Sequence, residues 1–341
     1  MRLDAGLGMN EPPTRDAAEC SYDEANSEAG RTGFARVVAL PTNVKAVEAA
    51  LLFARGGHPS VALVGPSGWG KSLLLDAATA VLSRTGQAVH VVSVSEFLGA
   101  APRAEAPVPL ILDNVQDALG HTRPRQALRR VLERRVELGR PVLLAFTGAK
   151  VTRSHKLFLP SSRSWLIAGI EEPELEERAL VVRSIAHKEG LTLAGGLVRV
   201  LARFAGSSGH SIVGACHQLK LFQSRWLRGD DVLRALGLLH PFLHHPSGWD
   251  VRDHVVDVMN ERLVGRDASE RRAPEQTLDL SAHLMLNRIC LSERDVAAYL
   301  QLTPGEAYSR ANRFAEQTKS PETAQLEAAG CEALLQSLEQ L

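Results

Sequence analysis

The eight residues "GPSGWGKS", 65–72, match the pattern G-x-x-x-x-G-K-S/T at every fixed position. An apolar run of strand length, "SVALVG", leads into them, and the helical stretch "KSLLLDAATAVLSR" overlaps their end. Glycines in such a loop let backbone N–H groups turn toward phosphate oxygens, and the following helix adds its positive N-terminus. This setting predicts a nucleotide-binding loop in an α/β fold, rather than a chance match in an ordinary strand–turn–helix corner.

Two side chains of this loop have a defined chemical task. Lys71 is expected to reach the terminal phosphates, and the hydroxyl of Ser72 is expected to hold Mg²⁺. The predicted cofactors are therefore ATP or ADP, together with Mg²⁺. The residues predicted to line the phosphate site are Gly65, Pro66, Ser67, Gly68, Trp69, Gly70, Lys71, Ser72 and Leu73.

Four further apolar runs of strand length follow the loop, and a stretch with helical periodicity covers 123–138 between the second and third of them. Strands that alternate with helices predict a parallel α/β sheet. Beyond residue 170 the strand signals stop, and only helical periodicity continues. The predicted strands cover 88–94, 108–115, 141–148 and 164–170.

These patterns divide the chain into five predicted parts. The first is a disordered tail, because its few large apolar residues cannot support a core. Within the lid, helices are expected over 174–187, 195–205 and 211–227. The parts are a tail (1–33), an α/β nucleotide-binding domain (34–170), a helical lid (171–240), an all-α helical domain (241–320) and a C-terminal tail or helix (321–341).

The predicted strand over 108–115, the third of the sheet, contains "LILDN" near its end, which places Asp113 and Asn114 beside the phosphate loop. A carboxylate at this strand end can bind Mg²⁺ through water, although it can also simply cap the next turn. Hydrolysis usually needs a second acid that orients and deprotonates the attacking water. Asn114 can orient water but cannot accept its proton, so the sequence predicts slow ATP hydrolysis or none.

Two more polar residues are candidates for the catalytic site. Thr147 ends the fourth strand and is expected to contact the γ-phosphate or the water. Arg163 comes just before the fifth strand, from where a basic side chain can reach a neighbouring subunit's γ-phosphate. A solvated arginine is the open alternative for Arg163.

The charges of the chain balance, with 39 Lys and Arg against 39 Asp and Glu. Neutrality speaks against a strongly basic nucleic-acid binder, but a small local patch can still carry phosphate contacts. The four cysteines are far apart and form no C-x-x-C pair, which fits a reducing compartment. No apolar run is long enough for a membrane span and no signal peptide is recognised, so a cytoplasmic protein is expected.

Together these residues resemble the AAA+ ATPases, and within them the DnaA family of bacterial replication initiators with its Hda-type regulators. The segment "FARVVALPTNVKAVEAA" resembles the family stretch that precedes the adenine pocket. The phosphate loop, "VSVSEFL" and "ILDNVQ" follow at family spacing, and "IEEPELEERALVVRSIAHKEGLTL" resembles the segment after the sheet. The resemblance over about 34–225 implies ATP binding and head-to-tail assembly with itself or with a DnaA-type AAA+ partner.

Several positions depart from the family pattern. The initiator usually has two acids where this chain has Asp113 and Asn114, whereas Hda-type regulators tend to read Asp-Asn. Ala149 stands where the sensor strand normally carries a carboxylate, and His210 is nearest the ATP-sensing arginine of the lid. Arg163 matches the interfacial arginine only with one residue missing nearby. These departures put ATP/ADP discrimination in doubt, but not nucleotide binding.

The last third resembles the initiator's DNA-binding domain more faintly. The stretch "LSERDVAAYLQLTPGEAYSRANRF" has the form of a helix-turn-helix, with the second helix over 306–314. "QLTPGEA" replaces the family signature "GGRDHST", so the base-reading residues do not carry over. Basic side chains that could still contact duplex DNA are Arg271, Arg272, Arg310 and Arg313.

The sequence thus favours a DnaA-like ATP-binding protein that binds duplex DNA and initiates or regulates chromosome replication, with weak ATPase activity at most. The first alternative is an Hda-type regulator that acts through protein contacts, its last domain being a bundle without DNA affinity. A loader or transposition helper built on the same core is less consistent with the helix-turn-helix form.

Overall fold

A computed structural model of the chain describes residues 33–99, 106–205, 208–243, 250–264, 274–318 and 320–340. The predicted tail, 1–33, lies outside these ranges except for its last residue. The chain forms two compact units, Met1–Pro173 and Glu174–Leu341, which we describe one at a time. No helix among the described residues is both long enough and apolar enough to cross a membrane.

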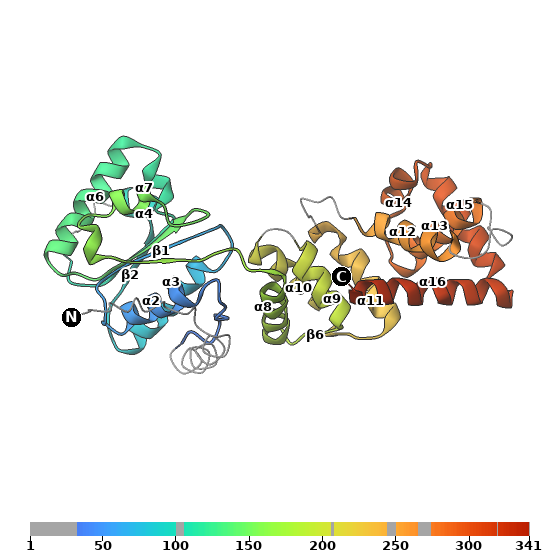
Figure 1. The fold of residues 1–341 in the computed structure, drawn as a ribbon, viewed down its shortest axis with the longest axis horizontal. Helices are drawn as coiled ribbons and strands as arrows, with labels where there is room; N and C mark the ends of the chain where they lie inside the picture. Colours follow the sequence, from blue (N-terminus) through green and yellow to red (C-terminus); the bar gives the residue numbers. More distant parts are fainter. Residues whose placement is uncertain are drawn as a thin grey trace, which may run out of the picture. The chain divides into compact units, whose positions relative to one another are not determined.

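The first unit is built on a five-stranded parallel sheet with the strand order β2-β3-β4-β1-β5, which confirms the predicted α/β class (Figure 1). Strand β1 is buried along its whole length, as expected for an apolar strand covered on both faces. The strands are β1 Ser60–Gly65, β2 His90–Ser93, β3 Leu110–Asp113, β4 Val142–Thr147 and β5 Leu166–Gly169.

The strand order decides which strand ends meet. Strand β4 lies between β1 and β3, and its register places Thr147 opposite Gly65. The amide of Gly148 then donates a 3.0 Å hydrogen bond to the Gly65 carbonyl. The carboxyl ends of β3, β4 and β1 therefore bring Asp113, Thr147 and the start of the phosphate loop to one edge of the sheet.

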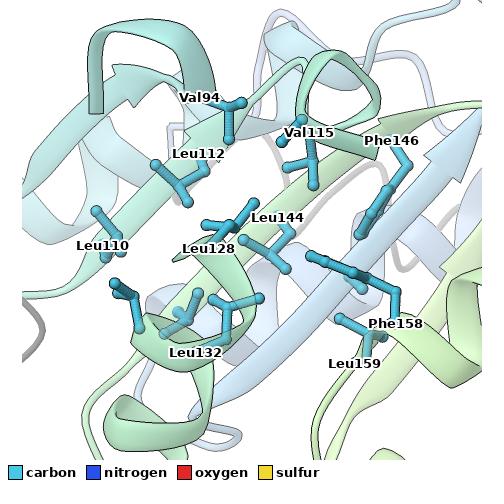
Figure 2. Packing of buried hydrophobic residues seen from close by; sticks show 14 of the residues in the cluster. Val94, Leu110, Leu112, Val115, Leu128, Leu132, Leu144, Phe146, Phe158 and Leu159 are labelled. Carbon is cyan, nitrogen blue, oxygen red and sulfur yellow. The ribbon is translucent and has the colours of Figure 1, made fainter. Parts of the chain in front are cut away.

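Helices cover both faces of this sheet, with α2 and α3 on one side and α4, α6 and α7 on the other (Figure 1). On the second side, Leu128 and Leu132 of α6 pack with Phe158 against Leu112 and Leu144 of the sheet (Figure 2). Full burial of one such side chain contributes roughly 1.5–3 kcal/mol. The helices are α2 Val44–Ala54, α3 Lys71–Arg84, α4 Val94–Gly99, α5 Gln116–Leu119, α6 Thr122–Glu137 and α7 Arg153–Phe158.

The second unit is almost entirely helical. Its α13 continues into a π-helical turn, Leu284–Arg288, and α14 and α15 are joined by a three-residue turn, 301–303. The helices are α8 Leu175–Lys188, α9 Gly195–Phe204, α10 Gly209–Phe222, α11 Gly229–Leu239, α12 Val251–Val264, α13 Pro274–His283, α14 Glu293–Leu300, α15 Pro304–Gln317 and α16 Pro321–Gln340.

Two expectations for this unit were wrong. A small parallel pair, β6 Thr192–Leu193 and β7 Arg225–Trp226, lies beyond the point where strand signals stop. The helix predicted over 211–227 ends at Phe222, and β7 takes up part of the remainder. Strands of two residues are too short to show the period-two alternation by which strands are recognised.

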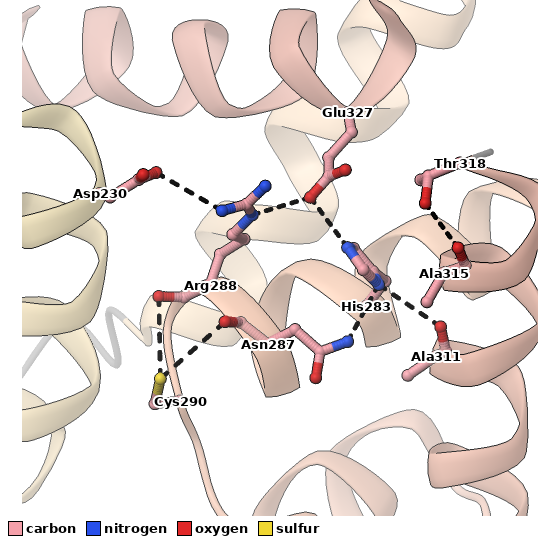
Figure 3. Close-up of polar contacts among 9 residues, drawn as sticks. All are labelled: Asp230, His283, Asn287, Arg288, Cys290, Ala311, Ala315, Thr318 and Glu327. Carbon is pink, nitrogen blue, oxygen red and sulfur yellow. Dashed lines mark hydrogen bonds and ion pairs between the residues drawn. The ribbon is translucent and has the colours of Figure 1, made fainter. Parts of the chain in front are cut away.

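The C-terminal segment is the long helix α16, which packs against α9 and α11 as well as α12. A Cβ added at Gly196 of α9 would lie 3.3 Å from the Cβ of Leu338, so α9 and α16 meet closely. Glu327 of α16, whose side chain is 12% exposed, accepts hydrogen bonds from His283 Nε2 (2.9 Å) and Arg288 Nε (2.7 Å), as Figure 3 shows. Helix α16 is therefore part of the core of the second unit.

Candidate nucleotide site and predicted DNA-contact residues

The loop between β1 and α3 has the backbone that a phosphate site needs. Gly68 and Gly70 have φ values of 80° and 91°, a left-handed conformation that residues with a Cβ rarely adopt. Gly70 is the residue that precedes the first turn of α3, so the N-terminal amides of that helix open onto the loop. These amides and the positive end of α3 suit an anion.

Lys71 is turned into the loop. Its Nζ donates hydrogen bonds to the carbonyl oxygens of Gly65 (2.9 Å) and Pro66 (2.7 Å), and the residue is only 7% exposed. Burial lowers the pKa of Lys71, while the nearby charge of Asp113 acts in the opposite direction. The ammonium is thus held inside the loop, where nucleotide phosphates would lie.

Ser72 and Asp113 connect the loop to the end of β3. The Ser72 hydroxyl donates a 2.5 Å hydrogen bond to Asp113 Oδ2, although 41 residues separate the two in the chain. A hydroxyl and a carboxylate are oxygen ligands of the kind that Mg²⁺ accepts alongside substrate phosphates and water. Among the described residues no cluster of three or more His, Cys, Asp or Glu could hold a metal.

Asn114 follows Asp113 in an unusual conformation, with φ at 54°. Its backbone amide donates to Asp113 Oδ1 at 2.7 Å, which helps to fix the carboxylate. The Asn114 side chain is exposed at the carboxyl edge of the sheet. An amide there can form hydrogen bonds but cannot act as a general base.

Gln116 is a polar residue of this edge that the sequence analysis did not single out. Its Oε1 accepts a 3.0 Å hydrogen bond from the backbone N–H of Thr147, and its Nε2 donates to Asn114 Oδ1 at 3.3 Å. Gln116 therefore connects the end of β3 to the end of β4. The only sequence signal for it was its position three residues after Asp113.

Arg163 lies in the short 3₁₀ turn Ser162–Ser164 just before β5, and it is exposed. The turn is anchored by Trp165, which is buried and donates from Nε1 to the Pro160 carbonyl at 2.9 Å. Within the part of the chain that the structure describes, the Arg163 side chain makes no ion pair or hydrogen bond. His210, the predicted lid counterpart, is exposed at the start of α10 in the second unit.

Two of the four arginines predicted to contact DNA are engaged within their own unit. Arg310 Nη1 donates to Asp279 Oδ1 at 2.9 Å, and Arg313 Nη1 donates to Asp279 Oδ2 at 3.3 Å. The Asp279 side chain is 6% exposed, whereas those of Arg310 and Arg313 are 21% and 53% exposed. One buried carboxylate of α13 therefore pairs with both arginines of α15. Arg271 and Arg272 lie outside the described residues.

The net charge of residues 250–341 is unfavourable for strong phosphate binding. Residues 250–341 contain 10 Lys and Arg and 16 Asp and Glu, which gives a net charge of −6. Helix α16 carries no Lys or Arg at all. The positive charge of the chain is concentrated earlier, in residues 34–249, with 26 basic and 16 acidic residues. Duplex DNA is a polyanion, so a protein gains affinity mainly by neutralising phosphates.

Comparison with known proteins identifies the fold. No protein-family model matches the sequence, and no curated protein matches it either. Among solved structures, domain III of the Thermotoga maritima replication initiation protein DnaA is 20% identical, with a TM-score of 0.53 over 62% of this chain and 97% of that domain. The replication initiator DnaA bound to AMPPCP and single-stranded DNA is 15% identical, with a TM-score of 0.50 over 89% of this chain and 98% of that one.

The chain shares the fold of these two DnaA structures. In this chain β4 lies between the strand that leads into the phosphate loop and the strand that ends in Asp113. At 15–20% identity the likeness is one of architecture.

Proposed function

We propose that this protein is a DnaA-like ATP-binding switch that initiates or regulates chromosome replication in the bacterial cytoplasm. The observation that carries the proposal is the meeting of Lys71, Ser72 and Asp113 at the carboxyl edge of a parallel sheet. In open parallel α/β sheets, ligands bind outside the carboxyl ends of the strands. Two solved structures with the same fold are DnaA proteins, one of which is bound to the ATP analogue AMPPCP.

The residues of the site have separate tasks in binding ATP and Mg²⁺. The amides of 68–72 and the ammonium of Lys71 would surround the phosphates, and Ser72 with Asp113 would hold the metal. Bound Mg²⁺ would neutralise phosphate charge and polarise the phosphoryl oxygens. These residues fit the cofactors because two left-handed glycines and a buried, inward-facing lysine form one anion-binding loop.

Slow hydrolysis follows from the residue beside Asp113. Asn114 cannot take a proton from water, and general-base catalysis typically contributes about 10²–10⁴-fold to a rate. ATP would then persist as a bound ligand that sets the state of the protein. Thr147 ends β4, the strand next to β1, and there its hydroxyl can sense the γ-phosphate.

Assembly is the expected consequence of ATP binding. Arg163 is exposed on an anchored turn, so it is available to a neighbouring subunit's nucleotide. The neighbour would be a second copy or a DnaA-type AAA+ protein. Analytical ultracentrifugation with ATP and with ADP tests this: Arg163→Ala should abolish an ATP-dependent shift in sedimentation, and a shift that survives would contradict the role.

The second unit leaves two versions of the proposal. In the first, α14 and α15 form a helix-turn-helix that binds duplex DNA through the half-exposed Arg313, and Arg271 and Arg272 are further basic residues for phosphate contacts. In the second, the protein is an Hda-type regulator that acts through protein contacts. The Asp279 carboxylate, which engages both arginines of α15, favours the second version.

Fluorescence polarisation with a labelled duplex separates the two versions. Binding that weakens steeply between 50 and about 200 mM salt is the signature of phosphate neutralisation and would support the first. Undetectable binding at low salt, with ATP present, would support the second. Isothermal titration with ATP tests the shared part of the proposal, because a protein without nucleotide affinity would contradict both.

A further inference from the structure

The hydrogen bonds at the sheet edge form one continuous series. Ser72 Oγ donates to Asp113 Oδ2 (2.5 Å), and the Asn114 amide donates to Asp113 Oδ1 (2.7 Å). Gln116 Nε2 donates to Asn114 Oδ1 (3.3 Å), and the Thr147 amide donates to Gln116 Oε1 (3.0 Å). The series runs from the start of α3, through the end of β3, to the end of β4.

The direction of each bond in this series is determined by its ends. A backbone N–H can only donate, so the Gln116 atom that faces Thr147 must be the carbonyl oxygen Oε1. The opposite atom, Nε2, is therefore a donor, and it also reaches Asp117 Oδ1 at 3.3 Å, a carboxylate oxygen that accepts. The Asn114 atom that faces Gln116 must then be the oxygen, Oδ1.

This fixes which end of Asn114 is left for a ligand. Its Nδ2, a donor with two hydrogens, points away from Gln116 on an exposed side chain. Nδ2 donates to no atom of the described residues. A donor beside Asp113 and the phosphate loop suits an anion, whereas a water-activating group would have to present an acceptor.

We propose that Gln116 orients the amide of Asn114 so that Nδ2 donates to the terminal phosphate of a nucleoside triphosphate, which makes the site prefer ATP over ADP. The inference rests on the proposed nucleotide-binding function and adds a residue that distinguishes the two nucleotides. Asn114 is the ligand-binding residue, and Gln116 is a positioning residue that acts through it. The same orientation explains why Asn114 is poorly suited to hold a water for attack.

The test compares affinities for the non-hydrolysable analogue AMPPNP and for ADP, each with Mg²⁺, by isothermal titration. Asn114→Ala should weaken AMPPNP binding about tenfold, the effect of one hydrogen bond to a charged group, and leave ADP binding unchanged. Gln116→Leu, which removes all three hydrogen bonds of the amide, should lower the same preference by a smaller factor. The double variant should resemble Asn114→Ala, because Gln116 acts only through Asn114.

The outcomes separate this inference from the function on which it rests. If the unaltered protein binds neither nucleotide, both fail. If it binds both and Asn114→Ala keeps the ratio of the two affinities, the inference alone is overturned. A parallel loss of both affinities would also overturn it, because a general loosening of the site would not spare ADP. Far-ultraviolet circular dichroism of each variant checks that the fold is kept.

Discussion

The two units of this protein differ in how their polar residues are used. In the first unit, Lys71, Ser72 and Asp113 converge on a common edge, where they can meet a ligand. In the second, Arg310 and Arg313 turn toward the buried carboxylate of Asp279. A phosphate loop depends on a backbone geometry that only a few sequences can adopt, so the role of its residues can be predicted from the local sequence. The charge of a surface helix depends on partners that lie far away in the chain.

The largest expected effects concern the cores of both units. Leu132→Ala in the first unit and Leu334→Ala in α16 should each lower the free energy of unfolding by about 2–5 kcal/mol, since both side chains are buried. Chemical denaturation followed by circular dichroism measures this. Gln325→Ala, on the exposed side of α16, is the matched control. A loss below about 1 kcal/mol for Leu334→Ala would mean that α16 is a loosely attached tail and not a core helix.

Lys71→Ala should weaken ATP binding by about 100-fold or more, because the variant loses charge-assisted hydrogen bonds to phosphate in a water-poor loop. Isothermal titration measures the loss. Lys150→Ala removes an exposed lysine just beyond β4 and should change the affinity little. Equal effects of the two substitutions on ATP affinity would contradict the assignment of 65–72 as a phosphate loop. The polar residues of the first unit would then no longer differ from those of the second in binding a ligand.

Substitutions of the arginines of α15 test the second unit, where basic side chains pair with a carboxylate of the same unit. Arg310→Ala should lower the free energy of unfolding by about 1–3 kcal/mol, because it takes a partner from the buried Asp279 carboxylate. Arg313→Ala should cost about 1 kcal/mol or less, since its side chain is 53% exposed. If Arg310→Ala instead left stability unchanged and reduced duplex binding, the arginine would serve DNA and not the fold.

The smallest expected effect is a pH dependence at Glu327. Desolvation would raise the pKa of this carboxyl, but the hydrogen bonds from His283 and Arg288 outweigh it, so the pKa lies below its usual 4.5. The stability that Glu327 contributes is then present above pH 4.5 and is lost as the pH falls through the lowered pKa. The difference in unfolding free energy between the protein and Glu327→Gln should shrink between pH 6 and about 3. A constant difference would contradict the ion pair.

Much of the first unit could be predicted from the sequence. The strands β1 and β3 are uninterrupted apolar runs, and the glycine pattern of 65–72 requires a phosphate loop between β1 and α3. The α/β fold class is confirmed by the parallel sheet and by the similarity in fold to the solved DnaA domain. These features depend on residues that are close together in the chain, so a single sequence is enough to predict them.

The rest depends on contacts between distant residues. Asp279 lies 31 and 34 residues from the arginines that it pairs with, and nothing local marks it as their partner. Gln116 meets Thr147 only because β4 lies beside β3, which no periodicity reveals. The core role of α16 is equally hidden, because its contacts on α9 and α11 come from other parts of the chain.

The most direct test of the account is the single-turnover rate of ATP hydrolysis at saturating ATP for the unaltered protein and for Asn114→Asp. If nucleotide stays bound because Asn114 supplies no base, the carboxylate should raise the rate at least about tenfold while ATP still binds. Thr147→Ala in the Asn114→Asp background should lower the rate again. Fast hydrolysis by the unaltered protein, or an unchanged rate with the carboxylate in place, would contradict the account.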